Sequence, residues 1–278
     1  MLTYNHDSVG LGDAARVAFT QTGAGADVVL IHGALATRED MLLSLCPALA
    51  PEFRVTAVDR PGHGGSTRSG WTGSPWRQAA AVHEASERLG LRRPVIVGHS
   101  HGGAVALAYA LQFPADVAGV VALAPITFPE LRLEHVLFGP RGAWPAGPVL
   151  NQVVSSTSDP VLLPLLWRAM FLPQAMPARY AAVFPFAEAG NSAHMEAEGE
   201  DAILLNLGLA RSAMMYGACS VPVRIFGGDR DLVVNNALHG RLAASLIPDG
   251  HYASLPGLGH MLHHFAQEPI VEAVRGLA

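Results

Sequence analysis

Short runs of apolar residues recur along the chain, and each stops within two residues at glycine, proline or aspartate. Such runs are typical of parallel strands that helices cover on both faces. Strands are expected at residues 28–31, 55–58, 94–97, 117–123, 221–226 and 251–255. Helices are expected at residues 38–49, 75–91 and 104–111, and from about residue 261 onward. This alternation predicts an α/β fold with a mostly parallel, doubly wound sheet.

The pattern changes between residues 127 and 209, which contain helical pieces broken by proline and no strand-like run. Large apolar side chains are frequent there: Phe138, Trp144, Leu162, Trp167, Met170, Phe171, Met176, Tyr180, Phe184 and Phe186. We interpret this stretch as a helical cap packed over one end of the sheet. The predicted organisation is a core of residues 1–126 and 210–278 with a cap of residues 127–209.

Composition excludes several classes of function. Half of the 278 residues are hydrophobic and 15% are charged, which argues against disorder. The net charge is −5 and no basic run occurs, so nucleic acid is not an expected partner. None of the 18 basic residues is lysine, which removes Schiff-base chemistry and the lysine-dependent phosphate loop.

The sequence also bears on location. Residues 1–7 lack the pattern of a secretion signal, and no apolar stretch is long and clean enough to span a bilayer. Cys46 and Cys219 lie far apart, and buried thiols are favoured over a single disulfide. We therefore expect a cytoplasmic enzyme without a membrane span, and its oligomeric state is not predicted.

The strongest chemical signal is a G-x-S-x-G motif from Gly98 to Gly102, placed between an expected strand and an expected helix. At such a turn the two glycines make room for a sharp reversal that lifts the Ser100 hydroxyl to the edge of the sheet. The chain has 29 glycines, so the motif alone could mark only a tight loop. Its position between strand and helix favours Ser100 as a nucleophile.

A serine hydroxyl needs a base, and His260 is the candidate because it lies on the loop after the last expected strand. His263 and His264 follow it and could be mistaken for a metal cluster, but no cysteine or carboxylate is expected to complete that set nearby. We interpret both as first-turn residues of the terminal helix. No metal and no cofactor are expected.

The base needs a carboxylate, and an attacked carbonyl needs two hydrogen-bond donors. Asp229 and Asp231 both follow the strand at 221–226, and the residues alone leave the choice between them open. One donor should be the backbone amide of His101. The second should come from the loop after residues 28–31, where the amide of Ala34 is the candidate for this oxyanion hole.

These residues, taken with further motifs, resemble the α/β-hydrolase fold family, in its branch of lid-bearing esterases, lipases and haloperoxidase-like serine hydrolases. The matching stretches are residues 30–33, 59–66, 98–103, 228–234 and 259–260. The family pattern G-x-x-D-x-x-V falls on Gly228, Asp231 and Val234, so the resemblance implies Asp231 as the acid. It also implies the amides of Ala34 and His101 as the oxyanion hole.

Departures from the family pattern limit what is implied. Dehalogenases and epoxide hydrolases of this family use an aspartate where this chain has Ser100. The lipase H-G-G-G motif is absent, since Ala34 and Leu35 follow Gly33. No family-specific cap signature is found, so the resemblance gives no particular substrate.

The expected function is therefore hydrolysis of an apolar carboxylic ester or related acyl compound through an acyl-enzyme on Ser100. The same residues could instead cleave a carbon–carbon bond, transfer the acyl group to an alcohol or form a peracid from hydrogen peroxide. A relative that only binds a ligand is the alternative from another class. Natural substrate and pathway do not follow from the fold.

Overall fold

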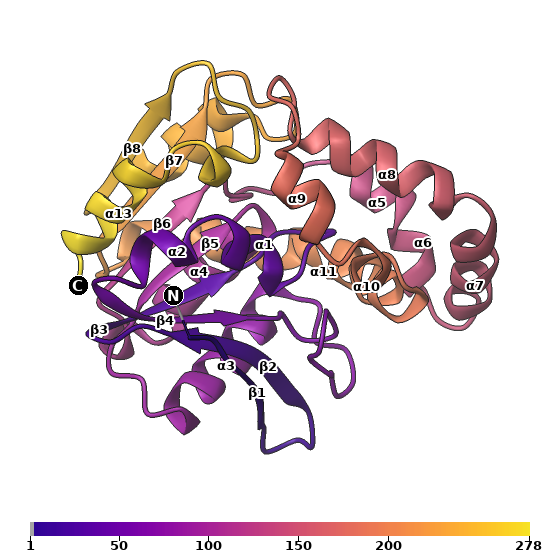
Figure 1. Ribbon diagram of the computed structural model, residues 1–278, viewed down its shortest axis with the longest axis horizontal. Helices are drawn as coiled ribbons and strands as arrows, with labels where there is room; N and C mark the ends of the chain where they lie inside the picture. The colour runs from indigo at the N-terminus through magenta and orange to yellow at the C-terminus, as the bar shows by residue number, and fades with distance from the viewer. Residues whose placement is uncertain (1–2) are drawn as a thin grey trace.

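An eight-stranded sheet forms the centre of the computed structural model, which describes residues 3–278 (Figure 1). The strands lie in the order β1-β2-β4-β3-β5-β6-β7-β8. They are β1 (Asn5–Gly10), β2 (Arg16–Thr22), β3 (Ala26–Ile31), β4 (Phe53–Val58), β5 (Val95–His99), β6 (Gly119–Leu123), β7 (Val223–Gly228) and β8 (Gly250–Leu255). Neighbours from β4 to β8 are parallel, whereas β2 is antiparallel to β1 and to β4. The predicted α/β class and mostly parallel, doubly wound sheet are confirmed.

Helices cover both faces of the sheet. The first face carries α1 (Arg38–Leu43), α2 (Cys46–Leu49) and α13 (Gln267–Arg275), and the second carries α3 (Pro75–Arg88), α4 (His101–Gln112) and α12 (Ala243–Leu246). Successive side chains of a strand point to opposite faces. In β3, Val28 and Leu30 pack on the first face, while Val29 and Ile31 pack on the second. Two cores on one sheet explain why these strands are apolar throughout.

Strands β1 and β2 are not predicted by the apolar runs. Almost every residue of β1 is exposed: it is one of the two edge strands and has no buried face that would leave a pattern. Strand β2 is mostly buried, but its apolar run is only three residues long, and the buried Thr20 and Thr22 follow it. The strand at residues 28–31 is therefore the third in the chain.

The helices expected at 75–91 and 104–111 differ from α3 and α4 by up to three residues at an end. Proline accounts for the differences in the other two. The helix predicted over 38–49 is divided, because a continuous helix would place Pro47 in its interior; α2 instead carries Pro47 in its first turn. The terminal helix begins at Gln267, so that Pro269 also lies in a first turn. His263 and His264 lie before it, in the 3₁₀ turn Leu262–His264.

Between β6 and β7 the chain forms helices only, and they extend to one side of the sheet (Figure 1). They are α5 (Leu133–Leu137), α6 (Gly139–Gly142), α7 (Gly147–Thr157), α8 (Asp159–Met170), α9 (Ala178–Val183), α10 (Phe186–Ala189) and α11 (Ser192–Met215). Phe138, Trp167 and Phe171 are buried in a cluster that also contains Leu35 and Met261 from the core loops. The core and cap boundaries stay a prediction, and α11 runs through the one at 209/210.

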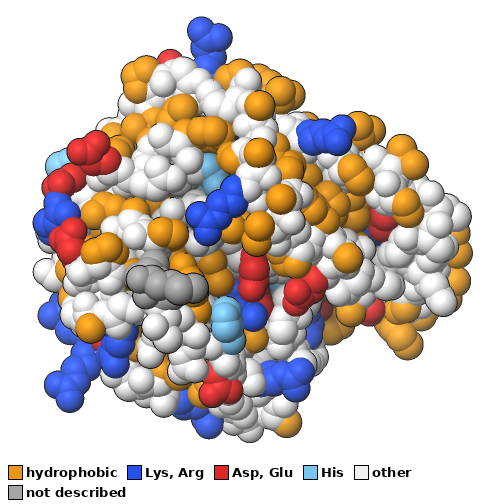
Figure 2. Space-filling view, in the orientation of Figure 1, with side chains coloured by type: hydrophobic (Ala, Val, Ile, Leu, Met, Phe, Trp, Pro, Cys, Tyr) orange, Lys and Arg blue, Asp and Glu red, His pale blue; other side chains and the backbone are white. Residues whose placement is uncertain are grey.

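The outer edge of this helical segment exposes hydrophobic side chains (Figure 2). Val149, Val161 and Leu165 are among them, and Trp144 is 76% exposed. None of the helices described in residues 3–278 combines the length and apolarity needed to cross a membrane. Cys46 and Cys219 are buried free thiols.

Candidate active site

Ser100 lies at the sharp turn between β5 and α4. Its φ of 54° and ψ of −115° are in a region that residues with a side chain rarely adopt. The flanking glycines are required by space: a Cβ on Gly98 would lie 2.1 Å from the Gly102 carbonyl oxygen, and one on Gly102 would lie 2.3 Å from the Ile31 carbonyl oxygen. The chain therefore reverses at Ser100, as the motif predicts.

His260 and Asp231 lie in contact on the loops after β8 and β7. The His260 Nδ1 is 3.0 Å from the Asp231 Oδ2, and both side chains are at most 3% exposed. The other carboxylate oxygen of Asp231 accepts hydrogen bonds from the backbone amides of Val233 at 2.8 Å and Val234 at 2.9 Å. Burial raises the pKa of Asp231, but the nearby imidazole and these amides outweigh it and hold the pKa below its usual value.

The two aspartates that the residues alone leave open occupy different places. Asp229 is exposed and accepts the Gly257 amide at 2.6 Å, which ties together the two loops that carry Asp231 and His260. Of these two aspartates, only Asp231 pairs with the His260 imidazole. The position of Asp231 thus agrees with the role that the resemblance implies.

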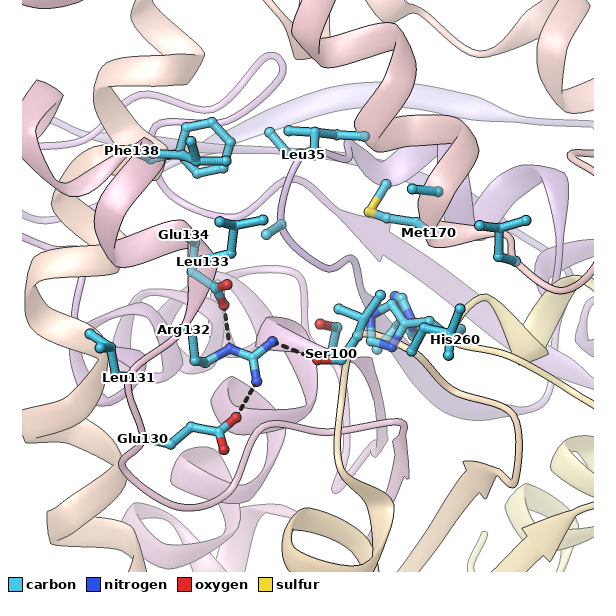
Figure 3. Close-up of a pocket in the computed structure, with 18 residues that line it drawn as sticks. Leu35, Ser100, Glu130, Leu131, Arg132, Leu133, Glu134, Phe138, Met170 and His260 are labelled. Atoms are coloured by element: carbon cyan, nitrogen blue, oxygen red, sulfur yellow. Dashed lines mark hydrogen bonds and ion pairs between the residues drawn. The ribbon is translucent and has the colours of Figure 1, made fainter.

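Ser100 and His260 line the same cavity of about 430 Å³, between the carboxyl edge of the sheet and the helical segment (Figure 3). Its wall is mainly apolar and includes Leu35, Leu131, Leu133, Leu137, Phe138, Leu166, Met170, Leu172, Leu232 and Val233. Three charged residues interrupt it. Arg132 lies 2.5 Å from both Glu130 and Glu134 and donates to the Val233 carbonyl at 3.2 Å. Two carboxylates thus face one guanidinium, and the group carries a net negative charge.

The candidate oxyanion loop follows β3 and lies against Ser100. A Cβ on Gly33 would be 3.2 Å from the Ser100 Cβ, and Ala34 lines the cavity. His101 is the first residue of α4, where backbone amides have no partner within the helix. Within residues 3–278, neither the Ala34 nor the His101 amide donates a hydrogen bond. Both amides are therefore free to bind a ligand oxygen.

A carboxylate does stand beside the histidines that follow His260, so the sequence-based expectation of none was wrong. The Asp40 carboxylate, on α1, accepts hydrogen bonds from His263 Nε2 at 2.9 Å and from His264 Nε2 at 2.8 Å. The His99 ring lies between His263 and His260, with its Nε2 3.1 Å from the His260 carbonyl oxygen. No local sequence signal joins Asp40 to His263, which lies 223 positions away in the chain.

Two groups of metal-ligating side chains occur within the described residues: Asp40 with His263 and His264, and Glu198 with His63 and His194. In the first, the two imidazoles already bond to both oxygens of the carboxylate. In the second, the Arg60 guanidinium is 3.2 Å from His63 Nε2 and 3.5 Å from Glu198 Oε1, so the protein itself supplies the positive charge. In both groups, contacts within the protein therefore pair the carboxylate.

Buried neutral histidines make acid destabilisation an expected result. Burial is the largest cause that lowers the pKa well below 6.5 in four of them, His32, His63, His99 and His101. Below pH 6.5 the unfolded chain binds protons there that the folded chain does not, so stability is lost as pH falls, by about 1.4 kcal/mol per group for each pH unit. Burial raises the pKa of Asp59 and Asp201 to about 6, which offsets part of this loss.

We therefore expect the free energy of unfolding to fall by roughly 4 kcal/mol between pH 7.5 and pH 5.5. Urea unfolding followed by circular dichroism at several pH values measures this. The variant His101→Gln, which cannot bind that proton, should show a shallower dependence by about one proton. A stability that is constant or rises on acidification would contradict the expectation.

Comparison with known proteins places the chain in a family. A family model described as alpha/beta hydrolase fold matches residues 28–267. A bifunctional esterase/perhydrolase of Acinetobacter calcoaceticus is 28% identical over 254 residues, which cover 82% of this chain and 83% of that protein. A monoacylglycerol lipase of Xenopus laevis is 36% identical over 106 residues, but these cover only 37% of this chain and 31% of the lipase.

Solved structures agree on the fold. A putative epoxide hydrolase of Pseudomonas aeruginosa superposes with a TM-score of 0.80 at 20% identity and covers 98% of this chain and 94% of its own. At that identity the likeness concerns the fold alone. The match of the family model over most of the chain decides the assignment: the chain belongs to the α/β hydrolase fold family.

Proposed function

We propose that the chain is a serine hydrolase that cleaves an uncharged, apolar carboxylic ester through an acyl-enzyme on Ser100. The observation that carries the proposal is the His260–Asp231 contact beside the cavity that Ser100 also lines. A hydrogen bond from Nδ1–H of His260 to Asp231 leaves the Nε2 lone pair free to act as a base.

The proposed reaction has two halves. His260 takes the Ser100 proton while the serine oxygen attacks the ester carbonyl, and the resulting oxyanion accepts hydrogen bonds from the amides of Ala34 and His101. The imidazolium then protonates the leaving alcohol, and the C–O bond breaks to give the acyl-enzyme. In the second half His260 deprotonates water, which attacks the acyl carbon and releases the acid and the free serine.

The cavity supports an apolar and uncharged substrate. Apolar walls with a few polar groups are the usual form of a small-molecule site. The only guanidinium described in the wall, that of Arg132, is already paired with Glu130 and Glu134. A substrate carboxylate would meet the net negative charge of this group and would be repelled.

Peracid formation is a second candidate, because a relative that matches over most of its length is a bifunctional esterase/perhydrolase. The first half of the reaction is the same. Hydrogen peroxide then replaces water as the nucleophile, which gives a peracid and the free Ser100. Peracid production that needs both ester and peroxide would support this second activity.

The test combines turnover with labelling. We expect hydrolysis of p-nitrophenyl butyrate and octanoate, with kcat/KM at least about tenfold lower for the mono-p-nitrophenyl ester of succinic acid, whose carboxylate the site disfavours. A fluorophosphonate should modify one residue per chain, and peptide mass spectrometry should place the adduct on Ser100. A folded protein that neither turns over esters nor accepts the label would contradict the proposal and favour a ligand-binding role.

A further inference from the structure

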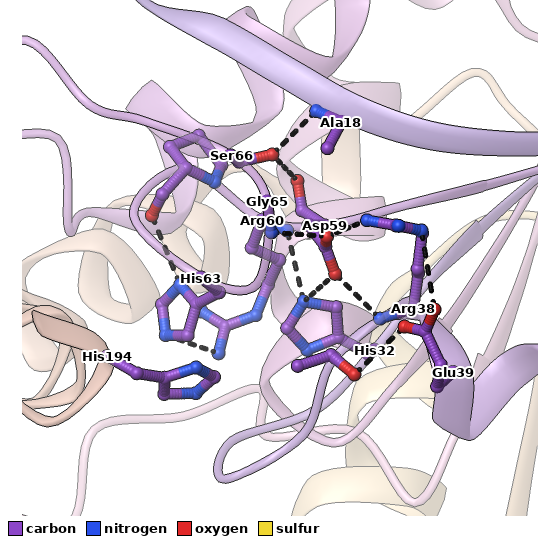
Figure 4. Close-up of polar contacts among 12 residues, drawn as sticks. Ala18, His32, Arg38, Glu39, Asp59, Arg60, His63, Gly65, Ser66 and His194 are labelled. Atoms are coloured by element: carbon purple, nitrogen blue, oxygen red, sulfur yellow. Dashed lines mark hydrogen bonds and ion pairs between the residues drawn. The ribbon is translucent and has the colours of Figure 1, made fainter. Parts of the chain in front are cut away.

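A buried group of ionic side chains contacts the candidate oxyanion loop. Figure 4 shows one member, Arg60, with the neighbouring imidazoles of His63 and His194. Arg60 comes from the loop after β4, whereas Glu198 and Asp201 come from α11. All three are at most 3% exposed. The Arg60 guanidinium pairs with Asp201 and lies 3.5 Å from Glu198 Oε1. None of these side chains takes part in the reaction proposed above. A buried ion cluster is costly to build, and its contacts to the loop indicate what it does.

Arg60 holds the peptide group before Ala34. The Gly33 carbonyl oxygen receives hydrogen bonds from Arg60 Nη2 at 3.2 Å and from His32 Nδ1 at 2.8 Å. His32 is fixed in turn, since its Nε2 accepts the Arg60 backbone amide at 3.0 Å. In a trans peptide the carbonyl and the following N–H point in opposite directions. Holding the Gly33 carbonyl inward therefore directs the Ala34 N–H away from the ion cluster.

Glu198 holds the peptide group after Ala34. Its Oε1 accepts the Leu35 amide at 2.6 Å. Leu35 has a φ of 55°, a left-handed conformation that is unfavourable for a leucine and persists only when its surroundings impose it. The Leu35 carbonyl accepts Trp167 Nε1 from α8 at 2.8 Å. The loop is thus fixed on both sides of Ala34, and in part by helices of the cap.

The charge of Glu198 is offset in part by Arg60, which also pairs with Asp201. Besides Arg60, the imidazoles of His63 and His194 lie 3.2 Å and 3.5 Å from its Oε1. Burial raises the pKa of Glu198, but the contact with the His194 imidazole and the positive charge of Arg60 outweigh burial and hold this pKa well below its usual value. Glu198 is then an anion that accepts the Leu35 amide, and Arg60 offsets its field near the site where an oxyanion would form.

We propose that Glu198, with Arg60, is a positioning residue that clamps the two peptide groups around Ala34 and so aims the Ala34 amide at the oxyanion. This inference rests on the proposed function, because it assigns a role within the same reaction. It makes α11 a part of the catalytic apparatus rather than only a wall of the cap.

The test uses kcat per active site, with sites counted by fluorophosphonate titration so that misfolded protein is excluded. Glu198→Ala should lower kcat about 100-fold, similar to the loss of one oxyanion donor, and change KM less than about threefold. The inhibition constant of a boronic acid, which mimics the tetrahedral intermediate, should rise by a similar factor. Glu198→Gln keeps an oxygen that can accept the Leu35 amide and should stay within about fivefold of the wild type.

The matched control is Asp159→Ala, which removes another buried carboxylate of the cap. Asp159 is 2% exposed and pairs with Arg141 at 2.6 Å and 2.7 Å, away from the oxyanion loop. It should lose stability but keep its kcat per titrated site. Equal losses in Glu198→Ala and Asp159→Ala, or a kcat for Glu198→Ala within threefold of the wild type, would overturn the clamp.

Glu198→Met fills the space without offering an acceptor and replaces Glu198→Ala if that variant does not fold, with the same expected loss. Failure of both to fold, while Asp159→Ala folds, would assign Glu198 to stability and also overturn the proposal. The wild type separates the two hypotheses. Ester turnover and a label on Ser100 with an unaffected Glu198→Ala would refute only the clamp, whereas an inactive, unlabelled wild type would refute the proposed function.

Discussion

Ser100→Ala should abolish ester hydrolysis, with a fall in kcat of about 10⁶-fold. The substitution removes the oxygen that forms the acyl-enzyme and leaves the cavity, the His260–Asp231 pair and the oxyanion donors in place. What remains should be the slow attack of water on a bound ester, still about 10³-fold above the uncatalysed rate. The measurement is the initial rate with p-nitrophenyl butyrate, at enzyme concentrations high enough to detect this residual rate.

The variant should fold normally, because alanine fits the turn at least as easily as serine. Its far-ultraviolet circular dichroism and melting temperature provide this control. It should also take up no fluorophosphonate. A folded Ser100→Ala protein that keeps more than about 1% of wild-type kcat would mean that another group is the nucleophile.

The second large effect concerns the pair of aspartates after β7. Asp231→Asn should lower kcat about 10⁴-fold, because the asparagine amide can donate to His260 Nδ1 and so favours the tautomer whose Nε2 carries a proton and cannot act as a base. Asp229→Asn is the matched control. An asparagine oxygen can still accept the Gly257 amide, so kcat should stay within about threefold of the wild type.

Both variants are measured with the same ester and scaled by the number of sites that fluorophosphonate titrates after long incubation. The contrast between them is more informative than either alone, since the two positions share one loop and the same change of charge. Similar losses in the two variants would show that loop geometry or charge, rather than the contact of Asp231 with His260, controls the rate.

The fold could be predicted from the sequence wherever burial leaves a pattern. Strands β3 to β7 are buried along almost their whole length, and their apolar runs predict them. Strand β8 is a mostly exposed edge strand with a weaker pattern. Strand β1 is an exposed edge, so its pairing with β2 depends on backbone hydrogen bonds that no side-chain pattern records. The breaks before α2 and α13 were visible in principle, since Pro47 and Pro269 exclude a continuous helix at those points.

The residues of the candidate site also differ in whether the sequence predicts them. Ser100, Asp231 and His260 each follow a strand, and parallel strands bring their carboxyl ends to one edge of the sheet. Asp40 and Glu198 instead lie on helices and contact loops 223 and 163 residues away in the chain. Such contacts depend on how the helices pack, which local sequence does not determine.

Helix α11 limits how this protein could be recombined. Its first half carries Glu198 to the loop beside Ser100, and its second half is anchored in the core, where Trp76 Nε1 donates to the Gly208 carbonyl at 3.1 Å. A chimaera that exchanges the whole segment between β6 and β7 would discard both attachments. Grafts intended to give a new substrate range should therefore end before Ser192, so that the donor helices replace the cavity wall and the recipient keeps its own α11.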